Sequence, residues 1–198
     1  MSRFDNRSRV STYIQSWVSG EPDFGVFESI ATTTVGVGGA SSVTFSSIPA
    51  TYKHLQIRMI NRVVGNSGGN TNSNIFMRFN GDTGTNYTRH LLYDQAGIGS
   101  VGSANASTIF ASAAPNSGNT SGIFGAEVVD ILDYANTNKF KTTRTIGGYD
   151  NNGVGGNRFS FESGVWRDTS AITTILIYPD NSETWAQYSS FALYGIKG

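Results

Sequence analysis

The two histidines, His54 and His90, are the side chains best suited to acid–base chemistry in this sequence, which contains no cysteine. A hydrolytic triad needs a histidine that a carboxylate orients and that faces a nucleophile. His54 lies on the polar face of a predicted strand, and His90 directly follows Arg89. We therefore expect both to be surface or interface histidines rather than catalytic ones.

Carboxylates offer a second route, because glycoside hydrolysis uses a pair of them across the scissile bond. Glu127, Asp130 and Asp133 lie in one predicted strand, where Glu127 and Asp133 share a face and Asp130 lies on the other. Six residues of strand separate Glu127 and Asp133 by about 20 Å, which is too far for a catalytic pair. Glu162 or Asp150 could complete a site only through a tertiary contact. We predict that the protein is not an enzyme.

Two turn sequences resemble oxygen-rich cation loops, namely NGDTG at Asn80–Gly84 and YDNNG at Tyr149–Gly153. A calcium loop needs several carboxylates at fixed spacing, whereas each of these turns has one aspartate. Asn, Asp and Gly also favour tight turns, so we predict turns and no metal or cofactor. The glycine-rich GVGGAS and GGYDNNGVGG lack the Gly-Lys-Ser/Thr of a phosphate loop and are predicted to be hairpin turns.

Aromatic side chains are numerous for a chain of 198 residues with only 38% hydrophobic residues. Those considered as site residues are Tyr93, Tyr134, Tyr149, Trp166, Tyr178, Trp185, Tyr188 and Tyr194. Large aromatics fill lean β cores and subunit interfaces, and exposed ones beside Asn and Asp can hold a sugar. The excess of aromatics on a surface without net charge predicts a homo-oligomer, and a trimer fits best.

Charge and composition restrict the partners. The chain has 14 Lys and Arg, 14 Asp and Glu, and a formal net charge of zero, without the basic cluster that a nucleic-acid surface needs. No apolar run is long enough to span a bilayer, and the first residues have no apolar core typical of a signal peptide. We expect no nucleic-acid partner, no membrane partner, and synthesis in a cytoplasm.

The elements that position these residues are short strands separated by Gly, Ser and Asn. Leu55, Ile57 and Met59 alternate with polar neighbours, which is typical of a half-buried strand. The predicted strands are residues 27–35, 42–48, 53–64, 75–80, 87–93, 107–113, 122–135, 140–150, 158–166, 171–179 and 184–196. Their spacing predicts an all-β fold in which residues 26–198 form an antiparallel β-sandwich, with a jelly roll as the expected topology.

Residues 1–25 differ from this body and are predicted to form an extended N-terminal attachment arm. Ile14 and Trp17 are spaced as on one face of a short helix, which Gly20 and Pro22 would end. The arm either folds back on its own sandwich or docks on a neighbouring protein. The proposed partner-binding residues are Arg3, Arg7, Arg9, Tyr13, Ile14 and Trp17.

Several stretches are similar to small virion structural proteins of tailed bacteriophages. They read FGVFESIATTTVGVGGASSVTFSSIPATYK from Phe24, DILDYANTNKFKT from Asp130, GGYDNNG from Gly147 and SFALYGIKG at the end, so the resemblance covers roughly residues 24–198. It implies a homotrimeric capsid decoration (cement) protein on the outer surface of the virion, in contact with the major capsid protein or another virion protein. It is also compatible with a fibre head domain that binds a host-surface glycan, or with a minor tail or baseplate component.

Overall fold

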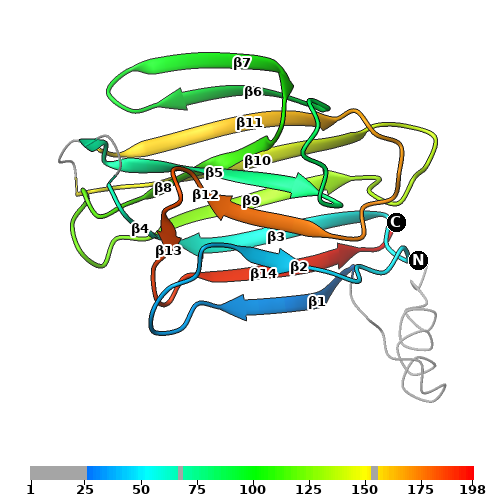
Figure 1. Cartoon of the computed structure of the whole chain (residues 1–198), viewed down its shortest axis with the longest axis horizontal. Helices are drawn as coiled ribbons and strands as arrows, with labels where there is room; N and C mark the ends of the chain where they lie inside the picture. Colours follow the sequence, from blue (N-terminus) through cyan, green and yellow to red (C-terminus); the bar gives the residue numbers. More distant parts are fainter. Residues whose placement is uncertain (1–25, 67–68, 153–155) are drawn as a thin grey trace, which may run out of the picture.

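The protein is an antiparallel β-sandwich (Figure 1). The computed structural model describes residues 26–66, 69–152 and 156–198, and these residues contain no α-helix. The all-β sandwich expected from the alternating strands is thus confirmed. All six residues proposed for the arm lie outside the described residues. No helix in the described part of the chain has the length and apolar character needed to cross a bilayer.

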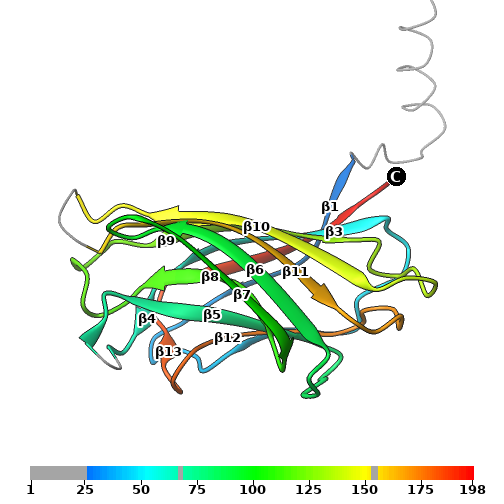
Figure 2. The same cartoon turned by 90° about the horizontal axis from the view of Figure 1, so that it is seen from above.

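Two sheets of unequal width form the sandwich, and a short ladder closes one end (Figures 1 and 2). In spatial order, the large sheet contains β1 (Phe27–Thr34), β14 (Ser190–Ile196), β3 (His54–Asn61), β9 (Gly125–Leu132), β10 (Lys141–Tyr149), β11 (Arg158–Trp166), β6 (Tyr87–Asp94) and β7 (Ile98–Ala106). The small sheet contains β2 (Val43–Phe45), β12 (Ile175–Pro179), β5 (Asn72–Phe79) and β8 (Ile109–Pro115). The ladder pairs β13 (Thr184–Trp185) with β4 (Val63–Val64).

Eight of the strands pair in a nested order along the chain. The strand β1 pairs with β14, β2 with β12, β3 with β9, and β5 with β8, so that the first pairs with the last and each later pair lies inside the previous one. The remaining long strands form two inserted hairpins, β6–β7 and β10–β11. Both hairpins extend the large sheet beyond β9, which makes it wider than the small one.

The period-two pattern decides which side chains enter the core. Leu55, Ile57 and Met59 of β3 are buried, as predicted, and so are Val129 and Ile131 of β9. The strand β9 lies in the middle of the large sheet, between β3 and β10. Burying such side chains between the two sheets is the main source of stability of the fold.

Two local predictions were wrong. GVGGAS at 36–41 is not a hairpin, because β1 pairs with β14 whereas β2 pairs with β12 in the other sheet. The segment instead crosses between the sheets, and Gly39 (φ 75°) passes so close to Trp185 that a Cβ would lie 2.7 Å from the Trp185 carbonyl oxygen. The strand β7 was not predicted, because Ile98–Ala106 consists largely of small and polar residues.

The β6–β7 hairpin curls over the edge strand β8 of the small sheet. Ile109 and Ala111 of β8 belong to the main core, whereas Phe110 and Ala113 pack in a second cluster with Leu91 of β6. All seven residues of β8 are therefore buried. This overhang places the inner face of β6 opposite the side of the small sheet that would otherwise face solvent.

Candidate functional site

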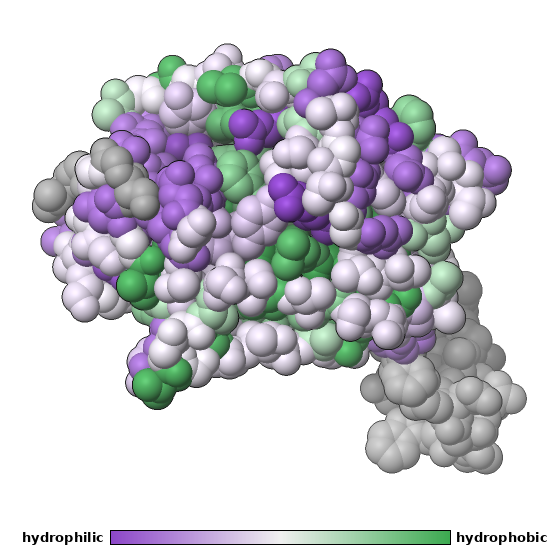
Figure 3. Space-filling model, viewed as in Figure 1, coloured by the Kyte–Doolittle hydropathy of each residue, from purple (hydrophilic) through white to green (hydrophobic). Residues whose placement is uncertain are grey.

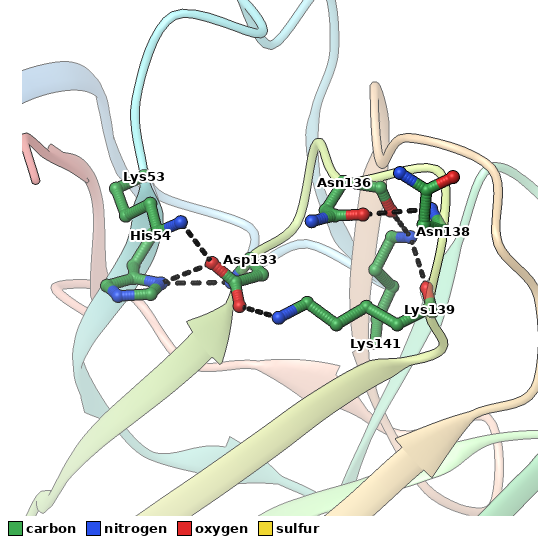
Figure 4. Close-up of polar contacts among 7 residues, drawn as sticks. All are labelled: Lys53, His54, Asp133, Asn136, Asn138, Lys139 and Lys141. Atoms are coloured by element: carbon green, nitrogen blue, oxygen red, sulfur yellow. Dashed lines mark hydrogen bonds and ion pairs between the residues drawn. The ribbon is translucent and has the colours of Figure 1, made fainter.

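The two histidines lie on the outer face of the large sheet and far from each other. Four strand spacings separate β3, which carries His54, from β6, which carries the exposed His90, so the two lie about 19 Å apart across the sheet. The Nδ1 atom of His54 accepts a hydrogen bond from the backbone N–H of Asp133 at 2.9 Å (Figure 4). The nitrogen that would serve as a base is thus engaged with the main chain.

Asp133 organises the turn that follows β9. It adopts a left-handed backbone (φ 49°), and its carboxylate pairs with Lys53 at 3.2 Å and with Lys139 (Figure 4). The hydrogen bonds from Lys139 and Lys53 lower the pKa of Asp133. The cluster ties β3 to the β9–β10 connection, and its geometry is that of a structural ion-pair network.

A buried lysine beside this turn was not found by sequence reasoning. Lys141 is fully buried, and its Nζ donates to the carbonyl oxygens of Asn136 and Lys139 at 2.5 and 3.0 Å (Figure 4). It also donates to the carbonyl oxygen of Thr169 at 2.9 Å. Burial lowers the pKa of Lys141. A lysine at a core-facing position of a strand is the one signal that could have identified it, because lysine is almost never fully buried without partners.

The chain contains one Gly-x-Ser-x-Gly spacing, at residues 65–69, which could mark a nucleophilic serine. In hydrolases this motif forms the sharp turn between a strand and a helix. Here it lies in the connection between β4 and β5, both of which are strands. Ser67 itself lies outside the described residues, so the motif contributes no site geometry.

Glu127 and Asp130 lie on opposite faces of β9, as predicted. The prediction for Asp133 was wrong, because β9 ends at Leu132 and Asp133 lies in the following turn with a left-handed backbone rather than on the face of Glu127. Glu127 faces the core and is 2% exposed, whereas Asp130 faces outward and pairs with Arg144 at 2.7 Å. Glu162 of β11 is also buried, at 3% exposed, and its charge contributes to raising the pKa of Glu127. Of the two carboxylates that could approach Glu127 through the fold, Glu162 is therefore the one that does so. Asp150 is exposed.

Gly147 of β10 makes room for the Glu127 side chain. It is paired directly with Glu127 across the sheet, and a Cβ at this position would lie 2.5 Å from the Glu127 Cγ. Asn61 Nδ2 donates to Glu127 Oε2, whereas Oε1 is buried without a hydrogen-bond partner. Burial raises the pKa of Glu127 well above its ordinary value.

Glu162 is even less compensated. Neither of its carboxyl oxygens has a hydrogen-bond partner among the described residues, and burial raises its pKa to about 8, although Ser160, Arg158 and Arg89 oppose the rise. At neutral pH Glu162 is therefore held mainly in the protonated form, and burial shifts the pKa of Glu127 in the same direction. Both lie between the sheets and are at most 3% exposed, so the pair lacks the access to a substrate that glycoside hydrolysis requires.

The NGDTG segment forms a tight turn built around Asp82. Its Oδ1 accepts the Gly84 N–H at 2.8 Å, and its Oδ2 accepts Trp166 Nε1–H at 2.7 Å and Asn86 Nδ2–H at 3.0 Å. Asn80 has a left-handed backbone, as predicted for this turn. In the described ranges, no group of three or more His, Cys, Asp or Glu side chains could hold a metal ion.

Four of the eight candidate aromatics are buried. Trp166, Trp185 and Tyr134 are at most 1% exposed, and Tyr149 is 8% exposed. The half-buried tyrosines have their ring faces covered by guanidinium groups, at 4.7 Å for Arg158 over Tyr93, 5.2 Å for Arg58 over Tyr194 and 5.3 Å for Arg78 over Tyr178. Tyr188, at 70% exposed, is the most exposed of the candidates.

An apolar patch lies on the outer face of the large sheet, and we call it the outer apolar face. Its residues, each at least 46% exposed except Val128, are Ile60, Leu92, Ile98, Val128, Ile146, Phe159 and Phe161. Val128, Ile146, Phe161 and Leu92 are direct neighbours on four adjacent strands. On the opposite, small-sheet side, the hydrophobic residues are scattered in small groups among hydrophilic ones (Figure 3).

Comparisons with known proteins leave the family open. No protein-family model matches the chain, and no curated protein matches it significantly. The function must therefore be argued from the sequence, the fold and the surfaces described above.

Proposed function

We propose that this protein is a non-enzymatic structural protein of a tailed-bacteriophage virion, specifically a homotrimeric capsid decoration protein on the outer shell. The observation that carries the proposal is the outer apolar face. A contiguous apolar patch on a soluble protein marks a surface that another protein covers. The resemblance of residues 24–198 to phage virion proteins supplies the setting, with the major capsid protein as the further partner.

The strand order supports a virion role. We interpret the four nested pairs β1–β14, β2–β12, β3–β9 and β5–β8 as a jelly roll to which two hairpins have been added. Double-sheet jelly rolls of eight strands are common in viral capsid proteins and lectins. The fold alone does not establish a function. The jelly-roll interpretation therefore supports a virion role only together with the outer apolar face.

A second copy of the chain is the occupant that the outer apolar face fits best. The charges at its two margins differ in sign, with Arg58 on β3 at one side and Asp94 on β6 at the other. A head-to-tail contact would bring Arg58 of one copy toward Asp94 of the next, and such heterologous contacts close into rings. The zero net charge of the chain lets three copies associate without strong repulsion.

Light scattering after size-exclusion chromatography tests the trimer. Phe161→Asp places a charge in the middle of the face and should convert the trimer to a monomer, because central apolar side chains dominate interface energetics. The matched control is Ser163→Asp, which changes the next outward position of β11 and should leave the trimer intact. A wild-type protein that is monomeric at about 100 μM, well above a typical micromolar Kd, would refute the oligomer.

The location on the particle is tested separately. Mass spectrometry of purified virions and cryo-electron microscopy should find many copies of the protein on the outer shell. Detection only at the tail tip or baseplate would contradict the decoration role while leaving the oligomer unaffected.

A further inference from the structure

A cleft of about 240 Å³ lies between the β6–β7 overhang and the small sheet, and we call it the arginine cleft. Its apolar wall is made by Leu91, Val101 and Phe110, and two guanidinium groups, those of Arg89 and Arg158, line it as well. Arg89 comes from β6 and Arg158 from the start of β11, so two adjacent strands of the large sheet bring both cations to one hollow.

Both arginines are held in place without a counter-ion. Arg158 is 8% exposed, donates to Gln95 Oε1 at 2.9 Å and stacks on Tyr93. Arg89 lies 5.3 Å from the ring centroid of Phe110. The Nε atoms of both side chains are buried without a hydrogen-bond partner, and no carboxylate of the described residues lies within 4 Å of either guanidinium group. Arg158 is buried and Arg89 is half-buried, and holding both cations in one cleft without an ion-pair partner is costly unless an anion binds there.

Glu162 is the carboxyl group that interacts electrostatically with both Arg89 and Arg158. It does not neutralise their charges at neutral pH. Because burial raises the pKa of Glu162 to about 8, its carboxyl is mainly protonated under physiological conditions. Among the other polar side chains of the cleft, Asn74 uses its Nδ2–H on Asp180 at 3.4 Å, which leaves its carbonyl oxygen as an acceptor. The cleft thus presents two charged donors, an amide acceptor and an apolar wall.

We propose that the arginine cleft binds the carboxylate of an acidic saccharide. A guanidinium group presents paired N–H donors that match the two oxygens of a carboxylate, and two such groups can hold it from two sides. The volume is sufficient for one pyranose ring. The apolar wall of Leu91, Val101 and Phe110 suits the C–H face of that ring.

A neighbouring hollow favours a saccharide over other anions. This hollow of about 590 Å³ shares Gln95 and Arg158 with the arginine cleft, so the two adjoin at that pair. Asp94, Asp150 and Asn157 line it; carboxylates accept hydrogen bonds from hydroxyl groups, and the amide of an asparagine can also donate to them. The two carboxylates disfavour a second acidic group there. The best fit is therefore one acidic sugar joined to neutral sugars, rather than a phosphate polymer or a polyacidic peptide. The arginine cleft itself contains no residue of the outer apolar face, so binding of the acidic sugar does not rest on the proposed trimer, whereas Asp94, Ile98 and Phe159 of the neighbouring hollow lie at the proposed contact between copies.

NMR of the ¹⁵N-labelled full-length protein tests the proposal directly, because the buried Nε–H groups of Arg89 and Arg158 give their own signals. The probes are D-glucuronate, an aldobiouronic acid and 3′-sialyllactose, with D-glucose and lactose as neutral controls and acetyl-Gly-Glu-Gly-amide as an acidic peptide. We expect at least one acidic sugar to shift both Nε–H signals with saturation, more weakly at high salt, and the neutral sugars to leave them unchanged.

Variants identify the residues. Arg89→Gln and Arg158→Gln should each weaken binding of the acidic sugar about tenfold or more, as expected for the loss of charged hydrogen bonds. The matched control is Arg78→Gln, since Arg78 also lies over a tyrosine ring, that of Tyr178, but does not line the cleft. Melting curves establish that each variant is folded. If a variant does not fold, the NMR titration of the wild-type protein alone decides whether the arginine cleft binds an acidic sugar.

Four results would overturn the proposal. The first is that none of the three acidic sugars shifts the arginine signals, and the second is that neutral sugars bind as well as acidic ones. The third is that the acidic peptide binds more tightly than every acidic sugar, which would assign the cleft to a protein carboxylate. The fourth is that Arg78→Gln weakens binding as much as Arg89→Gln does.

Discussion

Glu162→Gln should make the protein more stable, and increasingly so as the pH rises. The glutamine has the shape of the protonated acid but cannot ionise. In the wild-type protein, unfolding exposes Glu162 to water, where its pKa returns to its ordinary value of 4.5, whereas burial holds the pKa at about 8 in the folded state. Below pH 4.5 both states carry the proton, and the contribution of Glu162 to stability is then at its full value.

Between pH 4.5 and pH 8 the folded state keeps this proton and the unfolded state has lost it. The free energy of unfolding therefore falls as the pH rises, by about 1.4 kcal/mol per pH unit, and levels off above the folded-state pKa. Over the whole window the loss is about 5 kcal/mol. Glu162→Gln abolishes it, so the difference between variant and wild type should grow by about 4 kcal/mol from pH 5 to pH 8.

Urea unfolding of both proteins at pH 5, 6, 7 and 8 measures this difference. Glu28→Gln is the control, because the Glu28 carboxylate pairs with Lys197 at 2.7 Å, and the hydrogen bond from Lys197 lowers its pKa. That variant should lose stability relative to wild type above the ordinary pKa of 4.5. A constant difference between Glu162→Gln and wild type across the pH range would refute the reasoning. It would mean that Glu162 is ionised in the folded protein and neutralises Arg158 or Arg89, which would also weaken the case for an anion in the arginine cleft.

Three further changes test other parts of the structure. Gly147→Ala should cost about 1–3 kcal/mol through the clash of its Cβ with the Glu127 side chain, and thermal unfolding should show a smaller cost in a Glu127→Ala background. Lys141→Met leaves three carbonyl groups without their donor and should cost about 1–3 kcal/mol in urea unfolding, whereas Lys139→Met at the exposed neighbouring lysine should cost less than about 1 kcal/mol. Deleting residues 1–22 should leave a body with an unchanged β circular dichroism spectrum that no longer attaches to the particle, and normal attachment would show that the arm is incidental.

Strands whose inner and outer faces differ in polarity could be predicted from the sequence. Leu55, Ile57 and Met59 alternate with polar residues because β3 has one face in the core and one outside. The same rule put Glu127 and Val129 on one face of β9, and the structure shows that this face is buried. The rule failed for β7, an edge strand whose small residues carry no alternating pattern. Local turn chemistry also cannot tell whether a glycine-rich segment joins neighbours in one sheet or crosses to the other, as 36–41 does.

The polar features of the interior depend on contacts between distant parts of the chain. Glu162 approaches Glu127 only because β10 brings β9 and β11 to its two sides. Arg89 and Arg158 share a cleft only because β6 pairs with β11 and then curls over β8. None of these strand pairings has a local sequence signal. From the sequence alone, these two glutamates and two arginines therefore could not be distinguished from ordinary surface charges.

The nested pairing of the strands has a consequence for the order of events during synthesis. The innermost pair, β5–β8, can form as soon as β8 leaves the ribosome, but β2 must wait for β12 and β1 for β14. Such long-range pairing is slow to form, and incompletely paired strands expose apolar faces that aggregate. Until β14 emerges, the core-facing side chains of β3, among them Leu55 and Ile57, lack the neighbouring strand that covers one edge of the sheet. Folding of this protein is therefore completed after translation of β14, and a ribosome stalled before Ser190 would present an open sheet to chaperones and proteases.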